Sequence, residues 1–248
     1  MHLTCCECTW TNVATVFCVL SLLYAWLKHY GFLPKKDIRG WHTFITGAGS
    51  GIGRGLAIKM AAMGCKLTLV DVNEDGLHET KKMIKDKTGK DDNVNLQRLD
   101  VTDLDQMDKV AKQCVAKFGD VDILINNAGI VQGRKFWELD DKFTRKLYDV
   151  NLVSHSWLIN RFLGPMMKRN RGHIVSMSSY AGVTSFFSMA DYNASKAGAS
   201  MLMESLGGDL HIEGYYGVHT TTIQPTFINT GMFDGVKTSP FAPLLTTE

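Results

Sequence analysis

The sequence predicts an α/β protein built on a doubly wound, Rossmann-type parallel sheet. Short apolar segments alternate with amphipathic segments along most of the 248-residue chain, which is typical of strands and helices in βαβ units. The first apolar segment runs directly into a glycine-rich turn and then into an amphipathic stretch, residues 41–64. Polar and small residues follow several of the apolar segments, at the strand ends where open α/β sheets bind ligands.

Six strands are expected, at residues 41–46, 66–71, 95–99, 122–126, 172–177 and 218–223. The helices between them are expected from the glycine turn to about 64, at 74–87, up to about 118, over most of 140–170, and from the region of Tyr192 to about 211. No internal repeat or low-complexity segment divides residues 41–248. We therefore expect one domain there, preceded by a separate N-terminal segment, residues 1–40.

Composition excludes several classes of protein. The chain is 45% hydrophobic and 21% charged, which suffices for one domain with a substantial core. A net charge of +2 gives no strong attraction to nucleic acid. The six cysteines are few and lack a metal-ligand spacing with histidine, so we expect neither a disulfide framework nor a metal site. Reduced cysteines facing a cytosol-like compartment are the simplest interpretation.

The N-terminal segment has the character of a membrane-associating helix. Residues 13–27 are uncharged, with aromatic residues at Trp10, Tyr24 and Trp26, and four basic residues follow between positions 28 and 39. The run is a little shorter than the ~20 residues that span a bilayer, and its basic flank is expected on the cytosolic side. A cleaved signal peptide is the alternative, but the preceding residues lack Lys and Arg and no small-x-small cleavage site appears. We expect a retained anchor that spans the bilayer or lies in one leaflet.

The glycine-rich turn, Gly47-Ala-Gly-Ser-Gly51-Ile-Gly53, predicts a dinucleotide site because it lies between an expected strand and an expected helix. Glycines let the backbone approach a pyrophosphate, and the helix N-terminus supplies amides and a favourable dipole. Asp71 ends the next expected strand, where a carboxylate can bind ribose hydroxyls and repel a 2′-phosphate. Ser50 and Val72 add no positive charge, so NAD is favoured over NADP; the alternative is that Asp71 only begins a turn.

Tyr192 and Lys196 are the candidate acid–base pair. Positions i and i+4 share one face of a helix. A free tyrosine has a pKa of about 10, and a neighbouring ammonium group favours the phenolate, which would bring that pKa toward the working pH. An isolated tyrosine and lysine at this spacing occur on many ordinary helices. The interpretation therefore depends on the motifs upstream.

Together these motifs resemble the short-chain dehydrogenase/reductase family in order and spacing. The resemblance covers about residues 41–235 and rests on Thr46-Gly47-x-x-x-Gly51-x-Gly53, Asn126-Asn127-Ala128-Gly129, Asn151, Ser179 and Tyr192-x-x-x-Lys196. Within the family the chain looks most like the membrane-associated epidermal retinol dehydrogenases, a group that includes lipid-droplet 17β-hydroxysteroid dehydrogenases. The N-terminal apolar run and residues 71–80 and 225–233 carry this closer likeness.

The resemblance implies roles for individual residues. Tyr192 would be the acid/base, and Lys196 would lower its pKa and bind the nicotinamide ribose. Ser179 would orient the substrate oxygen, although the adjacent Ser178 competes for this role, and Asn151 would hold a water that links Lys196 to solvent. Ser179 and Tyr192 would contact the substrate. The cofactor contacts would be Gly47, Ser50, Gly51, Ile52, Gly53, Asp71, Asp100, Val101, Asn127, Ala128, Gly129, Tyr192, Lys196, Pro225, Ile228 and Thr230.

The implied function is hydride transfer between NAD and a lipophilic alcohol or ketone, with all-trans-retinol to retinal as the leading reaction. One alternative is a 17β-hydroxysteroid dehydrogenase or another NADP-dependent carbonyl reductase. A second is a catalytically weak, shortened form that acts as an interaction protein on a membrane or lipid droplet. The resemblance places the enzyme at the endoplasmic reticulum membrane or lipid droplets, facing the cytosol, with a possible homodimer through the helices of Asn151 and Tyr192.

Two departures from the family pattern occur near the C-terminus. The family often has Pro-Gly where this chain has Pro225-Thr226. Family members also continue through a substrate-loop helix, a further helix and a seventh strand, whereas this sequence stops soon after Pro240-Phe-Ala-Pro243. We therefore expect a shortened domain with an open sheet edge.

Overall fold

The computed structural model describes the backbone of residues 5–29, 36–226, 228 and 230, and the side chains of residues 13–27, 36–226, 228 and 230. The chain divides into two compact units, Met1–Ile38 and Arg39–Glu248. The expected absence of a seventh strand and the segment from Pro240 to Pro243 lie outside the described residues.

The first unit contains helix α1, Cys5–His29. Its apolar side chains from Val13 to Trp26 are exposed around the helix, with Phe17 and Leu22 each 71% exposed. Within the described residues, no helix combines the length and the apolar character needed to cross a membrane.

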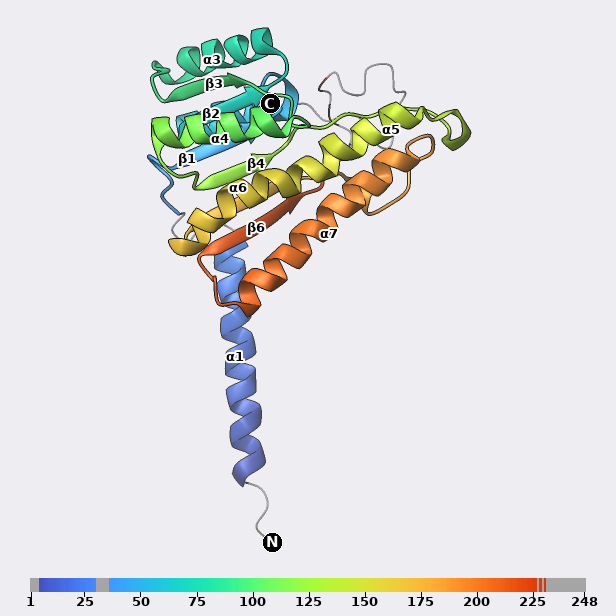
Figure 1. The fold of residues 1–248 in the computed structure, drawn as a ribbon. Coiled ribbons are helices and arrows are strands. Elements are labelled where there is room, and N and C mark those ends of the chain that lie inside the picture. The colour runs from blue at the N-terminus through green and yellow to red at the C-terminus, as the bar shows by residue number, and fades with distance from the viewer. Residues whose placement is uncertain (1–4, 30–35, 227, 229, 231–248) are drawn as a thin grey trace. The chain divides into compact units, whose positions relative to one another are not determined.

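The second unit is organised around one parallel sheet of six strands (Figure 1). The strands are β1 (His42–Thr46), β2 (Lys66–Asp71), β3 (Val94–Arg98), β4 (Ile123–Asn126), β5 (Gly172–Met177) and β6 (Val218–Ile223). Their order is β3-β2-β1-β4-β5-β6, and Ile45 of β1 pairs with Leu69 on one side and Ile125 on the other. The strand order reverses between β1 and β4, so the ligand crevice of such a sheet is expected there. The predicted Rossmann-type sheet is confirmed.

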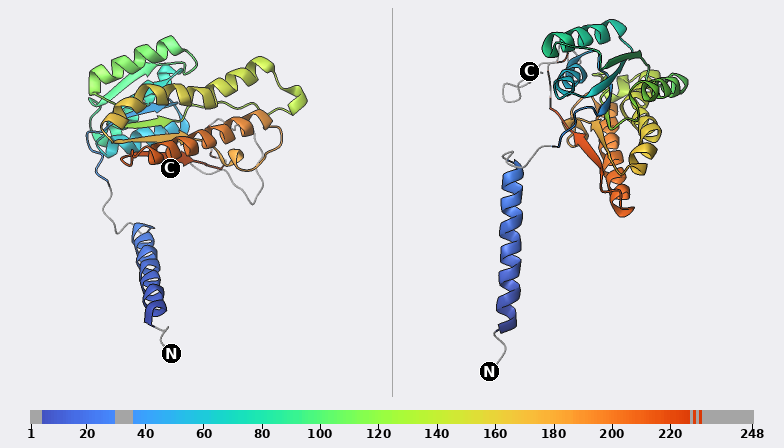
Figure 2. Two further views of the ribbon diagram at one scale, coloured as in Figure 1. Left: turned by 60° about the horizontal axis from the view of Figure 1, so that its bottom comes forward. Right: turned by 90° about the vertical axis from the view of Figure 1, so that its left-hand side faces the viewer.

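Helices cover the sheet in two groups. They are α2 (Gly51–Ala62), α3 (Glu74–Thr88), α4 (Leu104–Phe118), α5 (Asp141–Tyr148), α6 (Ser154–Lys168) and α7 (Ala190–Ile212), with short 3-10 turns η1 (Phe136–Glu138) and η3 (Tyr180–Gly182). Helices α2 and α3 pack on each other and on β1 to β3, whereas α6 and α7 pack on β4 to β6. Helices α6 and α7 lie side by side in both views (Figures 1 and 2). The core under α4 and α6 includes Phe44 and Phe162, whose ring centroids are 5.1 Å apart.

Residues 140–170 are largely helical, as predicted, but the helical type changes near the middle. Between α5 and α6 the backbone forms a π-helical segment, η2 (Asp149–Val153). A π-helical turn inserts an extra residue and changes which side chains face inward, and such turns are frequent at functional sites. Here it turns Asn151 fully inward, with 0% exposure.

Candidate active site

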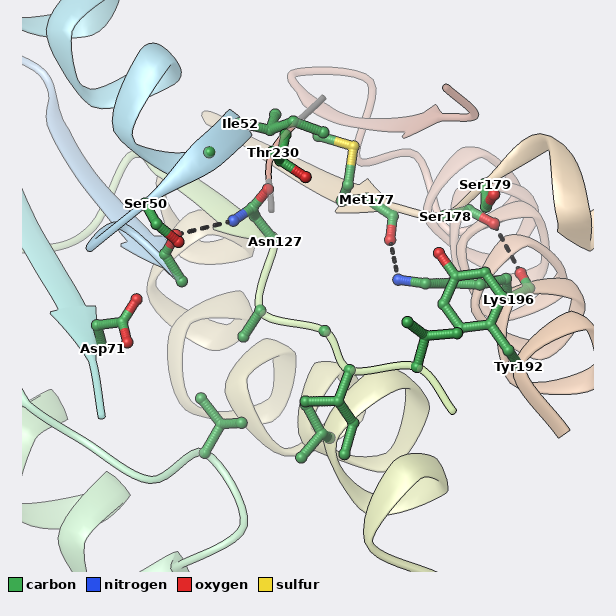
Figure 3. A pocket seen from close by; sticks show the side chains of 18 of the residues that line it. Ser50, Ile52, Asp71, Asn127, Met177, Ser178, Ser179, Tyr192, Lys196 and Thr230 are labelled. Carbon is green, nitrogen blue, oxygen red and sulfur yellow. Dashed lines mark hydrogen bonds between the residues drawn. The ribbon is translucent and has the colours of Figure 1, made fainter. Parts of the chain in front are cut away.

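A cavity of about 600 Å³ lies along the carboxyl ends of the central strands (Figure 3). Most of the residues predicted for the site line it, from the glycine turn, the ends of β2, β4 and β5, and α7. They are Gly47, Ser50, Gly51, Ile52, Asp71, Asp100, Val101, Asn127, Ala128, Gly129, Ser179, Tyr192, Lys196, Pro225, Ile228 and Thr230. The predicted residues Gly53 and Asn151 are not among the lining residues.

Gly53 supports the glycine turn from behind. A Cβ atom at this position would lie 2.0 Å from the Gly47 carbonyl oxygen and 2.6 Å from Asn127 Nδ2. No side chain fits in that space, so only glycine lets the first turn of α2 pack this closely against β1 and the end of β4. The Asn127 amide occupies the junction and donates to the Thr46 carbonyl at 2.9 Å and to the Gly47 carbonyl at 3.2 Å.

The N-terminus of α2 is prepared for an anion. Helices α3, α4 and α5 each begin with a side-chain cap, from Asn73, Asp103 and Asp140, and carry an acid in the first turn. Helix α2 has neither: Ser50 makes no side-chain capping bond, and its first turn contains no acid. Its first amides and the positive end of its dipole therefore remain for a ligand, which is the chemistry that binds a pyrophosphate.

Asp71 is fixed at the end of β2 by two backbone amides. Its Oδ2 accepts from Gly49 N and its Oδ1 from Asn73 N, both at 2.9 Å. Each oxygen keeps a lone pair that could accept from a ribose hydroxyl. The nearby guanidinium group of Arg54 donates to Glu79 Oε2 at 2.6 Å and to Thr80 Oγ1 at 3.1 Å. Arg54 is thus paired behind the turn and does not line the cavity.

Lys146 is a cavity residue that the sequence did not reveal. Burial alone would raise the pKa of Asp100, but hydrogen bonds from the Thr102 amide and hydroxyl and the charges of Lys146 and Arg98 outweigh it, so this pKa is lowered. Nothing in the sequence distinguishes Lys146 from the other charged residues between positions 140 and 146. The other unpredicted lining residues are Val70, Val72, Leu99, Ile130, Val131, Phe143, Val150, Met177, Ser178 and Thr226. Nearly all are apolar, and nothing in the sequence distinguishes them from core residues.

Tyr192 and Lys196 lie one turn apart on α7, as predicted, and both are buried, at 4% and 3% exposure. The Lys196 ammonium is 5.7 Å from the Tyr192 ring centroid and donates to the Met177 carbonyl at 2.8 Å. Burial lowers the pKa of Lys196 to about 8. Burial also raises the pKa of Tyr192, and a hydrogen bond with Ser179 only partly opposes this. The sequence led us to expect a lowered tyrosine pKa, but in the protein alone desolvation of the phenol dominates.

Ser178 and Ser179 have different surroundings. The Ser178 hydroxyl donates to the Lys196 carbonyl at 2.7 Å and accepts from Ser200 Oγ at 2.8 Å, and this residue is buried. Ser179 is half-buried, accepts from the Ala181 amide at 3.1 Å, and is hydrogen-bonded to the Tyr192 side chain. Ser178 therefore joins β5 to α7, whereas the Ser179 hydroxyl lies beside the tyrosine.

Asn151 lies behind the cavity and joins three segments. Its Oδ1 accepts from the Ile130 amide at 2.8 Å, and its Nδ2 donates to the Ile130 carbonyl at 2.9 Å and to Ser195 Oγ at 3.1 Å. A Cβ atom added to Gly129 would lie 3.4 Å from both Asn151 Oδ1 and Lys196 Nζ. Both polar groups therefore lie beside Gly129.

Comparison with known proteins decides the family. The family model described as short chain dehydrogenase matches residues 42–240, which is most of the chain. The chain is a short-chain dehydrogenase/reductase. The family prediction from the sequence motifs is thereby confirmed, and the protein is an oxidoreductase.

Relatives of this dehydrogenase include enzymes named for retinol and for steroids. It is 40% identical to short-chain dehydrogenase/reductase family 16C member 6 of Bos taurus, over 92% of this chain and 73% of that protein. It is 40% identical to epidermal retinol dehydrogenase 2 of Homo sapiens, over 89% of this chain and 71% of that protein. It is 37% identical to estradiol 17-beta-dehydrogenase 11 of Homo sapiens, over 88% and 72% respectively.

Solved structures of the family agree with the fold. A short-chain dehydrogenase/reductase from Burkholderia phymatum in complex with NAD superposes with a TM-score of 0.75 at 32% identity, covering 84% of this chain and 77% of that one. A metagenomic short-chain oxidoreductase in complex with NADP gives a TM-score of 0.70 at 28% identity, covering 77% and 84%. The dehydrogenase fold therefore binds NAD or NADP, and the sequence motifs have identified the correct class of cofactor.

The two serines give a first testable prediction. If Ser179 orients the substrate oxygen, as the resemblance implies, Ser179→Ala is expected to lower kcat/KM for oxidation of an alcohol about 10²-fold, because a positioned donor is lost. Ser178→Ala is expected to keep the chemistry but lower the free energy of unfolding by about 1–2 kcal/mol, because buried acceptor and donor groups lose a partner. Steady-state kinetics and urea unfolding of both variants measure the two effects. Full activity in Ser179→Ala would contradict the assignment.

Proposed function

We propose that this short-chain dehydrogenase/reductase oxidises a lipophilic alcohol with NAD, and that all-trans-retinol, converted to retinal, is its leading substrate. The observation that carries the proposal is the cavity itself, which Asp71 and the α2 N-terminus line together with Ser179, Tyr192 and Lys196. The retinol dehydrogenase relatives favour the retinoid. A 17β-hydroxysteroid is the second candidate, because relatives at 37% identity carry an estradiol dehydrogenase name.

The residues present fit a nicotinamide dinucleotide. The first turn of α2 would hold the pyrophosphate, Asp71 the adenosine ribose, and Lys196 the nicotinamide ribose. When bound, the nicotinamide ring supplies the acceptor for the hydride that leaves the carbinol carbon. The other predicted cofactor contacts, among them Asn127 and Gly129, would bind the cofactor or line its cleft.

The chain's own residues handle the proton. Tyr192, as the phenolate, takes the proton of the substrate hydroxyl and becomes the neutral phenol. The electron pair of the broken O–H bond forms the second bond of the C=O group, and the carbinol hydrogen leaves with the C–H pair as hydride. Ser179 Oγ orients the substrate oxygen at the phenol. The Lys196 ammonium group stabilises the phenolate by its charge. Asn151 fixes the backbone of Ile130 behind Lys196 and is proposed to hold the water that returns the proton to solvent.

Asp71 is proposed to set the preference for NAD over NADP. In Asp71→Asn the side chain keeps an acceptor oxygen but loses the charge that strengthens ribose binding and repels a 2′-phosphate. The ratio of kcat/KM with NAD to kcat/KM with NADP is expected to fall about 10-fold or more. The exposed acid Glu74 gives the matched control, because Glu74→Gln changes the charge three residues away. An unchanged ratio in Asp71→Asn would contradict the proposal.

The substrate is tested by turnover in membranes carrying the full chain. Retinol and a 17β-hydroxysteroid are each offered with NAD and with NADP, and membranes carrying Tyr192→Phe serve as the blank. The proposal expects retinol turnover with NAD above the blank. Steroid turnover with NADP would favour the second candidate, and rates equal to the blank with every pair would remove the enzyme function.

We also propose that residues 1–40 are an anchor that holds the catalytic domain, residues 41–248, at the endoplasmic reticulum membrane or on lipid droplets, facing the cytosol. A helix that is apolar on all sides needs an apolar environment, and the described part of α1 has this character. Carbonate extraction tests the anchor, since release of the intact chain would reject it.

We also propose a homodimer through the Asn151 and Tyr192 helices. Met201, which is 61% exposed on α7, supports this interface. Chemical crosslinking tests it.

A further inference from the structure

A group of polar side chains is buried under α6, apart from the residues assigned above. His155 on α6 and Ser176 on β5 are 1% and 0% exposed, and His155 Nδ1 lies 2.8 Å from Ser176 Oγ. Asn126 ends β4, is 0% exposed, and is paired in register with Ser176. We call these three residues the β4–α6 polar pocket.

Three polar atoms of this pocket lack a partner among the described residues. They are Asn126 Nδ2, Asn126 Oδ1 and His155 Nε2. Buried amides and imidazoles are nearly always hydrogen-bonded, to protein or to ordered water. A buried water typically makes about three such bonds to polar groups that would otherwise be unsatisfied. An amide with both ends free and an imidazole nitrogen are suitable partners for it.

The strand pattern places these groups together on one face of the sheet. Leu124, Ile174 and Leu158 of α6 belong to one core cluster, and α6 packs on β4 and β5. Side chains two residues apart on a strand share a face, so Asn126 and Ser176 also point toward α6. His155 precedes Leu158 by about one helical turn on α6 and follows Asn151 by four residues. The pocket therefore lies at the end of the core nearest the cavity.

The pocket also lies close to the proposed catalytic lysine. The Met177 carbonyl that accepts from Lys196 belongs to the residue after Ser176. His155 is close enough to Lys196 for the lysine charge to act on it: burial, and secondly this charge, lower the pKa of His155 to about 3. The imidazole is therefore neutral at every working pH and can serve as a hydrogen-bonding dipole beside the ammonium group.

We propose that Asn126 and His155 bind ordered water in the β4–α6 polar pocket, and that His155 is a positioning residue through which this hydrated pocket stabilises the charged form of Lys196. The binding of water stands on the unpartnered atoms alone. The action on Lys196 rests on the proposed dehydrogenase function and deepens it. In the described chain, Lys196 of α7 is the charged group that acts on His155. The neighbours from β4 and β5, Asn126 and Ser176, are uncharged. Arg161 of α6 is paired with Asp108 at the surface.

Water binding is tested by a double-mutant cycle in urea unfolding of the full chain in detergent. If Asn126 and His155 share water, Asn126→Leu and His155→Leu each lower the folded-to-unfolded ratio. The folded-to-unfolded ratio of the double variant should then be about 10-fold higher than the product of the two single losses predicts. Either substitution alone already disrupts the shared site, so the second costs little more. Asn95 gives the matched control: it is buried on β3 with its own unpartnered Nδ2, but β2 and β1 separate it from β4. Asn95→Leu should be additive with His155→Leu. Additive losses for Asn126 and His155 as well would overturn the water site.

The action on Lys196 is tested by the pH profile of kcat. In His155→Leu the ammonium group loses hydration, so the alkaline limb, where Lys196 loses its proton, is expected to move about one pH unit lower. His155→Gln keeps a polar end and should restore most of the shift. His42 is a buried histidine on β1, bonded to the Gly119 carbonyl and Thr68 Oγ1, and His42→Leu should leave the limb in place. An unshifted limb in His155→Leu would overturn the positioning role. Absence of turnover in the unaltered chain would instead reject the proposed function, and the unfolding cycle would still decide the water site.

Discussion

Replacing Tyr192 by phenylalanine is expected to lower kcat/KM for alcohol oxidation about 10³-fold. The substitution removes one oxygen atom, which in the proposed mechanism accepts the substrate proton, and positioned acid–base groups contribute about 10²- to 10⁴-fold. The ring itself packs against Leu147, Ala181 and Met189, and phenylalanine preserves that contact. The loss should therefore fall on catalysis and leave the fold intact.

The control for this prediction is Tyr180→Phe, which removes a phenol from an exposed position on η3, where the residue is 46% exposed. Cofactor binding, followed by fluorescence, should be nearly unchanged in both variants. Because burial raises the pKa of Tyr192, the phenolate forms only at alkaline pH in the protein alone. Oxidation by the unaltered chain should therefore accelerate as pH rises, until Lys196 begins to lose its proton near pH 8, and this acceleration should disappear in Tyr192→Phe. Comparable turnover by the two proteins would remove Tyr192 from the mechanism.

The sequence predicted the features of this protein that depend on local spacing. The strands β2, β5 and β6 begin and end where the sequence predicted. The glycine turn requires glycine for steric reasons, as the space around Gly53 shows. Tyr192 and Lys196 meet because four residues make about one helical turn. The spacing that reveals each of these features is local, although the space at Gly53 is also limited by Asn127 at the end of β4.

The features that the sequence missed all depend on packing between distant segments. The π-helical segment at Asn151 packs, together with α5, against α7, and no local pattern marks it. The direction of the Tyr192 pKa follows from burial, which outweighs the nearby charge that spacing alone suggested. The motif spacing favoured Ser179 over Ser178, but the different partners of the two serines on α7 appear only in the fold. For the same reason, the sequence around His155 does not indicate that Asn126 of β4 lies near it in the fold.

Lys196→Met is expected to abolish most of the oxidation activity while making the folded protein more stable at neutral pH. Lys196 has a pKa of about 8 in the folded protein, against the ordinary 10.5, because of burial. Below pH 8 the ammonium group is charged in both folded and unfolded chains, and burying it costs about 3 kcal/mol, at about 1.4 kcal/mol per pKa unit. Above pH 10.5 the lysine is neutral in both states, so this cost disappears. The methionine side chain is uncharged at every pH, so the variant never has this cost.

The difference in unfolding free energy between Lys196→Met and the unaltered chain should thus be largest at pH 7. Loss of the bond to the Met177 carbonyl offsets part of the gain, which leaves about 1–2 kcal/mol. As pH rises from 8 toward 10.5, the unaltered chain becomes more stable relative to the variant, by up to about 3 kcal/mol. Urea unfolding at pH 7, 8.5 and 10 measures the change, and Lys112→Met, at an exposed site on α4, should show none of it. A difference that stayed constant with pH would mean that the buried ammonium carries no such cost. A difference that falls as pH rises would show that the fold tolerates a destabilising charge at Lys196, where the proposed chemistry needs it.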